Sequence, residues 1–88
     1  MTQQDLNGRV ALVTGGSRGI GAAIALALAN SGAAVAVNYR ERAADAEAVA
    51  GKIKTAGGRA MTVRADVSQG ADVTRMVGEI AAALGPID

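Results

Sequence analysis

A glycine-rich segment, residues 14–21, has the residue types and spacing to carry out chemistry in this sequence. Its glycines follow the spacing Gly-x-x-x-Gly-x-Gly, in which Gly15, Gly19 and Gly21 are the three fixed positions. The segment follows a short apolar run and precedes a helical pattern, which is the context that a phosphate-binding loop requires. Free N–H groups at the start of a helix, aided by the helix dipole, bind anionic phosphates. We therefore predict that this segment binds the phosphates of a nucleotide.

Each glycine has an expected role in such a loop. Gly15 lets the chain turn sharply out of the sheet, and Gly19 removes a Cβ where a pyrophosphate approaches the backbone. Gly21 lets the helix pack close to the sheet. The spacing differs from the Gly-x-Gly-x-x-Gly of the common dinucleotide fingerprint, and the Lys-Ser/Thr ending of a Walker loop is absent. A glycine-rich turn that merely connects a strand to a helix remains the alternative.

The elements that position this loop repeat three times along the chain. Short apolar runs at 10–13, 33–37 and 60–65 alternate with helical patterns at 19–31, 41–56 and 68–84. A glycine follows each helical pattern, at Gly32, Gly57 and Gly85, as expected of left-handed residues just past a helix end. Strands that alternate with helices predict an α/β fold with a parallel sheet and right-handed crossovers.

The three strands differ in their patterns. The first two are continuously apolar and are expected inside the sheet, whereas the third alternates and is expected at an edge. This predicts the strand order 3-2-1, with the first two helices on one face and the third on the other. The sequence ends at Asp88, where a fourth strand is expected beside the first. The first strand is then an open edge, and such an edge favours self-association.

Composition excludes several classes of protein. Nine basic and eight acidic side chains leave a net charge of +1, which gives no broad electrostatic surface for nucleic acid or membranes. The absence of Cys and His excludes disulfides and the commonest metal ligands, so no metal site is predicted. The longest apolar run, residues 20–29, is too short to cross a bilayer, and residues 1–7 do not resemble a signal peptide. A cytoplasmic protein is the expectation.

Four segments in order resemble one known family. The loop matches the pattern Thr-Gly-x-x-x-Gly-x-Gly, and residues 35–40, 63–67 and 84–88 follow it as the family pattern requires. From about Leu6 onward the chain resembles the N-terminal half of the classical short-chain dehydrogenase/reductase family. It is most similar to the bacterial subgroup of 3-oxoacyl-[acyl-carrier-protein] reductases and glucose-dehydrogenase-like enzymes. The resemblance implies residues 1–88 form one partial Rossmann domain (βαβαβα), truncated before the fourth strand.

The choice of cofactor is read from residues that the resemblance places beside the adenine ribose. An NAD site has an acidic residue at the end of the second strand, whereas an NADP site supplies Arg for the 2′-phosphate. Tyr39 stands at the acidic position, and Arg40 follows it. Ser17 and Arg18 complete a set suited to charge-assisted hydrogen bonds with a phosphate. We expect NADP(H) rather than NAD(H). In the alternative, Arg18 and Arg40 are surface charges paired with acidic neighbours such as Glu41 or Asp45.

Further residues enter the cofactor site through the resemblance. The Asp66 side chain and the Val67 backbone are expected at the adenine, and Ile20 and Asn38 complete the predicted cofactor-binding set. Alternatively, Asp66 caps the third helix, and both roles are compatible.

No residue of this chain is predicted to be catalytic. The family's catalytic Asn, Ser, Tyr and Lys follow later in the chain, and Ala43 occupies the fourth position after Tyr39, where a catalytic Tyr requires Lys. The chain is thus expected to be the cofactor-binding half of an NADP(H)-dependent oxidoreductase that transfers hydride between NADPH and a carbonyl or alcohol. It is expected to be inactive alone. Two alternatives stay open: a non-catalytic nucleotide-binding module, and a structural fragment completed by self-association.

Overall fold

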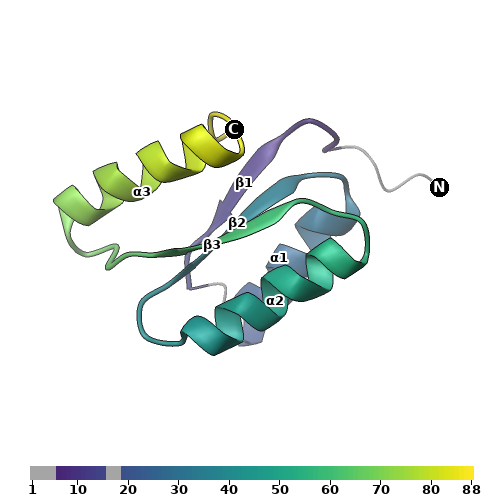
Figure 1. Cartoon of the computed structure of the whole chain (residues 1–88), viewed down its shortest axis with the longest axis horizontal. Coiled ribbons are helices and arrows are strands. Elements are labelled where there is room, and N and C mark those ends of the chain that lie inside the picture. Colours follow the sequence, from purple (N-terminus) through teal and green to yellow (C-terminus); the bar gives the residue numbers. More distant parts are fainter. Residues whose placement is uncertain (1–5, 16–18) are drawn as a thin grey trace.

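Six elements alternate along the chain in the computed structural model, which describes residues 6–15 and 19–88 (Figure 1). They are β1 (Val10–Val13), α1 (Gly19–Asn30), β2 (Ala34–Tyr39), α2 (Ala43–Thr55), β3 (Ala60–Arg64) and α3 (Gly70–Ala83). The predicted alternation of strand and helix is confirmed. Gly32, Gly57 and Gly85 have φ angles of 101°, 92° and 109°, so all three adopt the predicted left-handed conformation after a helix.

The three strands form one parallel sheet in the order β1-β2-β3. Val10 lies opposite Ala34 in the first pair of strands, and Val35 lies opposite Ala60 in the second. The predicted order 3-2-1 is therefore confirmed. Parallel strands end at a common edge, so the segments that follow β1, β2 and β3 emerge on the same side of the domain.

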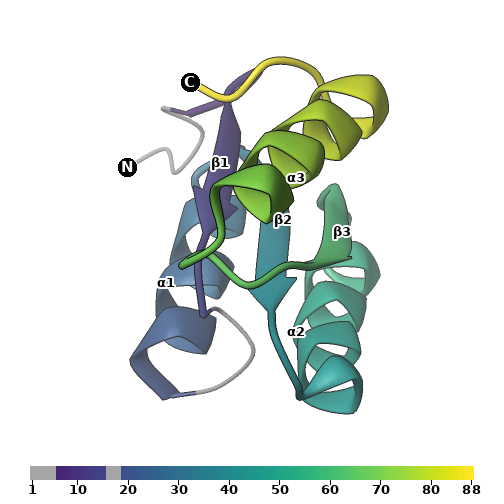
Figure 2. The same ribbon diagram turned by 90° about the vertical axis from the view of Figure 1, so that its left-hand side faces the viewer.

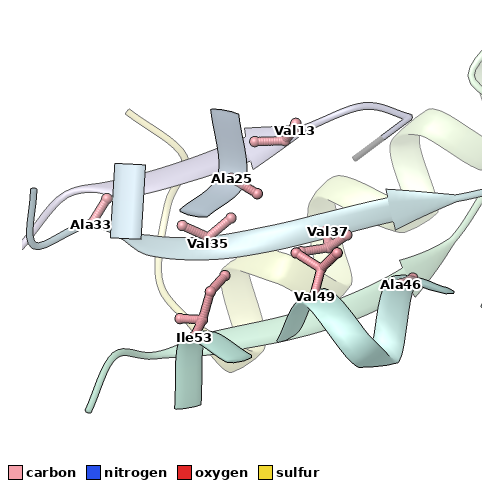
Figure 3. Close-up of a cluster of buried hydrophobic side chains, with 8 residues drawn as sticks. All are labelled: Val13, Ala25, Ala33, Val35, Val37, Ala46, Val49 and Ile53. Atoms are coloured by element: carbon pink, nitrogen blue, oxygen red, sulfur yellow. The ribbon is translucent and has the colours of Figure 1, made fainter. Parts of the chain in front are cut away.

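The two faces of the sheet are covered by different helices. Figure 2 shows α1 and α2 on one face and α3 alone on the other, as the crossovers predict. The α1/α2 face holds a cluster of small and branched apolar side chains, which Figure 3 shows meeting from the strands and both helices. It contains Val13, Ala25, Ala33, Val35, Val37, Ala46, Val49 and Ile53. Side chains of β2 alternate between the faces, which is why Val35 and Val37 lie here, and Ala34 and Ala36 lie opposite.

The α3 face has its own apolar cluster. It contains Val10, Ala34, Ala36, Val63, Ala65, Met76 and Ile80. Met76 and Ile80 are four residues apart and project from one side of α3 onto the sheet. Val77, which the helical pattern also places on the apolar face, is 40% exposed. The next residue along a helix points about 100° away from Met76, so the stripe that the sheet covers is narrower than predicted.

Most element boundaries differ from those predicted by one or two residues, and two of these differences bear on the edge where the strands end. β2 continues past residue 37 to Tyr39, because Asn38 and Tyr39 pair with Val63 and Arg64 of β3. α3 begins at Gly70 instead of residue 68, because a turn closed by Asp66 occupies the residues before it. The first change lengthens the sheet at the edge where the strands end, and the second leaves a turn between β3 and α3 at that edge.

The outer side of β1 is partly paired. The Asp88 N–H donates to the Val10 carbonyl at 3.0 Å, and the Val10 N–H donates to the Asp88 carboxylate Oδ2 at 2.8 Å. The Arg9 carbonyl accepts from the Ala34 N–H, so odd-numbered residues face β2 and the backbone groups of Val10 and Leu12 face outward. The open edge expected at β1 therefore begins at Leu12.

Candidate cofactor site

The turn after β1 is shaped by two glycines. Gly15 and Gly19 both have φ of 62°, in the left-handed region that side chains disfavour. Among the described residues, none lies within 4 Å of a Cβ built at either glycine. The sharp turn expected at Gly15 is present. Gly19 was expected only to remove a side chain from the phosphate, and its φ gives a second, conformational reason for glycine.

Some of the other predicted loop residues lie in α1, and the rest lie outside the described residues. Gly21 lies in the first turn of α1, and Ile20 beside it is 81% exposed. The predicted phosphate ligands Ser17 and Arg18 lie outside the described residues. The start of α1 thus presents backbone N–H groups at the edge where the strands end.

Asn38, near the end of β2, is buried to 3% exposure and bonds only to backbone groups among the contacts described for it. Its Oδ1 accepts from the Gly15 N–H at 3.3 Å. Its Nδ2 donates to the carbonyls of Val63 at 3.3 Å and Ala65 at 3.2 Å, with a longer contact to the Tyr39 carbonyl. The side chain therefore joins the carboxyl ends of β2 and β3 to the beginning of the glycine loop.

Tyr39 and Arg40 point to different surroundings. The half-buried Tyr39 packs against the apolar cluster of the α1/α2 face. Arg40 is exposed and forms an ion pair with Asp66, with 3.5 Å between Nη2 and Oδ2. The alternative paired Arg40 with Glu41 or Asp45. In the structure Asp45 pairs with Arg42 instead, at 3.7 Å. Arg40, predicted at the 2′-phosphate, and Asp66, predicted at the adenine, are neighbours in the folded chain.

Asp66 closes the turn between β3 and α3. Its Oδ1 accepts from the Ser68 hydroxyl at 2.6 Å and from the Ser68 N–H at 3.0 Å. Since α3 begins at Gly70, the carboxylate stabilises the turn before the helix and does not cap the helix itself. The Ser68 hydrogen bonds, with a smaller contribution from the Arg40 charge, lower the pKa of Asp66 from its ordinary value of 3.8, although desolvation opposes them. The group is therefore a carboxylate at neutral pH, and Val67 beside it is 51% exposed.

Two charged residues of α3 that the sequence analysis does not single out hold this edge together. The Asp72 carboxylate accepts from the Asp66 N–H at 3.0 Å, and the Arg75 guanidinium donates to the Arg64 carbonyl at 2.6 Å. Arg75 also pairs with Glu79 and, at 3.8 Å, with Asp72. Their helical spacing gave no signal of these contacts, because the partners lie six and eleven residues back on another element.

The described residues fit a nicotinamide dinucleotide at this edge. Gly15 and Gly19 leave open backbone where phosphates approach, and Arg40 supplies an exposed cation. The carboxylate of Asp66 and the apolar surface of Val67 lie at the end of the neighbouring strand. No cluster of three or more metal-ligating side chains occurs in residues 6–15 and 19–88. Over the same residues, no helix has both the length and the apolar character needed to cross a membrane.

Comparisons with known proteins agree with this geometry. The family model described as "short chain dehydrogenase" matches residues 9–88. The chain is 46% identical over 83 residues to the short chain dehydrogenase claC of Passalora fulva, covering 94% of this chain and 31% of that protein. It is 52% identical over 83 residues to an uncharacterized oxidoreductase of Methylorubrum extorquens, covering 94% of this chain and 34% of that protein.

Solved structures show the same likeness. A dehydrogenase/reductase from Sinorhizobium meliloti superposes with a TM-score of 0.93 at 49% identity, covering 99% of this chain and 34% of that one. A short chain dehydrogenase from Burkholderia cenocepacia, solved in complex with NADP, gives a TM-score of 0.90 at 48% identity, with 96% and 34% covered. The chain thus spans about a third of the length of these relatives. With the glycine loop, the parallel sheet and the family match in agreement, the chain belongs to the short-chain dehydrogenase/reductase family.

Proposed function

We propose that this chain is the cofactor-binding half of an NADP(H)-dependent oxidoreductase that transfers hydride between NADPH and a carbonyl or alcohol substrate. The observation that carries the proposal is Arg40, an exposed cation at the end of β2, where Tyr39 replaces the acidic residue of an NAD site. The Burkholderia cenocepacia relative in complex with NADP supports the same cofactor.

The residues of this chain bind and orient in the proposal. The N–H groups at the start of α1 hold the pyrophosphate, with Gly15 and Gly19 leaving the backbone accessible. Arg40, joined by Ser17 and Arg18, binds the 2′-phosphate, and Asp66 with Val67 contacts the adenine. When bound, NADPH supplies the hydride. Reduction also needs a proton donor, and we assign none of this chain's residues to that role.

The isolated 88-residue chain is therefore proposed to be inactive as a reductase. NADPH oxidation with a panel of ketones, followed at 340 nm, should stay at the rate without protein. A protein-dependent rate would contradict this part of the proposal. The nearer likeness to 3-oxoacyl-[acyl-carrier-protein] reductases and the cytoplasmic location both stay predictions.

A titration with NADP⁺ and NAD⁺, read by heat and by thermal shift, tests the proposed cofactor. A ligand at 100 times its dissociation constant should stabilise the fold by about 2.7 kcal/mol, and NADP⁺ should bind more tightly than NAD⁺. If neither dinucleotide binds a folded chain, the proposed cofactor-binding role of this chain is wrong.

Arg40→Asp sharpens this test. The substitution replaces a phosphate contact by repulsion and supplies an acceptor for ribose hydroxyls. The affinity for NADP⁺ should therefore fall, and the affinity for NAD⁺ should rise. Arg59→Asp is the matched control, because it makes the same charge change on an exposed residue at the opposite end of the sheet. Unchanged discrimination between the dinucleotides in Arg40→Asp would remove Arg40 from the site.

We also propose that copies of this chain associate through the free part of β1 or through α3. The outward backbone groups of Leu12 support pairing at the strand, beside a hollow of about 310 Å³ lined by Leu6, Leu12 and Ile87 among others. The exposed Val77 supports contact at the helix. Sedimentation velocity should show a mass that rises with concentration, and a monodisperse monomer at high concentration would refute the proposal.

A further inference from the structure

We infer that Asn38 is a positioning residue: it acts on the cofactor through the Gly15 backbone and does not touch the cofactor itself. The inference rests on the proposed function for its effect on binding, while its structural part is independent of any ligand. It also changes the role predicted for Asn38, which the sequence resemblance places among the cofactor-binding residues.

The first step is that burial and existing hydrogen bonds close the Asn38 side chain to a ligand. The amide is 3% exposed, and both of its polar atoms are already bonded. Nδ2 carries two hydrogens and faces the carbonyls of Val63 and Ala65, while Oδ1 faces the Gly15 N–H. The second lone pair of Oδ1 is buried with the rest of the side chain, so a cofactor could reach this amide only by displacing the groups packed around it.

The second step is that the orientation of the amide is fixed by its partners. Turning it over would place Oδ1 against the carbonyl oxygens of Val63 and Ala65, and Nδ2 against the Gly15 N–H. Every contact would then pair two acceptors or two donors. The donor side therefore belongs to β3 and the acceptor side to the glycine loop.

The third step is that only asparagine satisfies this arrangement at this length. Aspartate at neutral pH accepts but cannot donate, serine offers one short hydroxyl, and leucine offers neither group. Because an unmade bond leaves buried backbone groups unsatisfied, an apolar residue here is costly to the fold. The buried amide is thus explained by the need to donate to one element and accept from another.

The fourth step connects the two ends of the proposed site. Ala65, whose carbonyl accepts from Asn38, immediately precedes Asp66, where the adenine is proposed to bind. Gly15, at the other end of the amide, begins the loop proposed to bind the pyrophosphate. One side chain thus joins Gly15, at the beginning of the loop, to the residue that precedes Asp66.

The wild-type chain gives the first test, without any ligand. Gly15 lies outside the strand ladder, so a free loop would exchange its amide hydrogen at nearly the rate of an unstructured peptide. We expect NMR to show the Gly15 amide exchanging at least tenfold more slowly than that rate. Exchange at the unstructured rate would overturn the inference, whether or not the cofactor binds.

Two variants give the second test. Asn38→Ala removes the acceptor, whereas Val63→Ala removes a 3% exposed side chain at the same end of the sheet and leaves the Gly15 contact in place. Protection of Gly15 should disappear in the first and persist in the second. NADP⁺ affinity should fall about tenfold further in Asn38→Ala than in Val63→Ala, a difference of about 1.4 kcal/mol. Equal effects of the two variants would overturn the inference.

A third variant keeps the test informative if Asn38→Ala does not fold. Asn38→Asp retains an acceptor for the Gly15 N–H but loses both donors to β3. It should keep Gly15 protected while the free energy of unfolding falls, and loss of that protection in a folded chain would count against the inference. If Gly15 behaves as expected but NADP⁺ does not bind the wild-type chain, the proposed function fails and the positioning role stands.

Discussion

The end of β1 and the ends of β2 and β3 form one edge of the sheet, yet different interactions hold them in place. The turn after β1 is shaped by backbone conformation, through Gly15 and Gly19 with φ of 62°. The ends of β2 and β3 are held by side chains, through the Arg40–Asp66 ion pair and the contacts of Asp72 and Arg75. Asn38 is the described side chain that connects the two regions. Glycine conformation can therefore shape one end of this edge, whereas the other end needs contacts between side chains.

The largest expected effect comes from α3, whose Asp72 and Arg75 hold the side-chain region. Ile80→Ala removes a fully buried side chain and should lower the free energy of unfolding by about 2–5 kcal/mol in urea titrations. Hydrogen exchange should rise first in α3 and the Asp66–Ser68 turn. Ile53→Ala, in α2, is the control and should affect the opposite face first. Equal acceleration at β1 and α3 in the Ile80 variant would mean that the two regions are not separable.

Substitution of a glycine tests the turn after β1, which backbone conformation shapes. Gly15→Ala places a Cβ on a left-handed residue and should cost about 1–2 kcal/mol, although nothing lies within 4 Å to clash with it. Gly78→Ala is the matched control, because it lies in α3 with equally open surroundings and should stabilise by up to about 1 kcal/mol. Thermal unfolding measures both. The same sign of change in the two variants would argue against conformational control at Gly15.

A smaller effect is expected where α3 holds the end of β3. Arg75→Ala removes the hydrogen bond to the Arg64 carbonyl and an exposed ion pair with Glu79, and should cost about 1 kcal/mol or less. NMR shifts of Asp66 and Val67 should change, while those of Gly15 should not. Arg42→Ala is the control: it breaks a comparable exposed pair with Asp45 and should leave the NMR shifts of Asp66 unchanged.

The smallest effect is the acid sensitivity of the Asp66 turn. Because the pKa of Asp66 is lowered in the folded chain, its contribution to stability is complete above the ordinary value of 3.8. The contribution is lost as the pH falls below that value through the lowered pKa. Asp66→Asn should reduce the change in stability across this range, which urea titrations at several pH values measure. If the free energy of unfolding depends on pH in the same way in Asp66→Asn and in the wild-type chain, the Ser68 contacts do not stabilise the fold.

The division between the two regions also explains what the sequence could predict. Glycine spacing and helix-ending glycines are local signals, so the turn at Gly15, the six elements and the strand order were predictable. The partners of Asn38 lie 23 to 27 residues away, and Asp88 meets Val10 across 78 residues. Such pairs depend on the register of the sheet, which no local pattern specifies. Asn38 was therefore predicted in the site, but the contacts that define its role were not.

The contact between Asp88 and Val10 has a consequence for any strand that adds to β1. With both backbone groups of Val10 engaged by Asp88, the ladder can continue only from Leu12. Since neighbouring side chains on a strand point to opposite faces, a shift of one residue would exchange every inward and outward side chain. Asp88 therefore determines where a strand that adds to β1 can begin to pair. It thereby determines which side chains of that strand face the core and which face away.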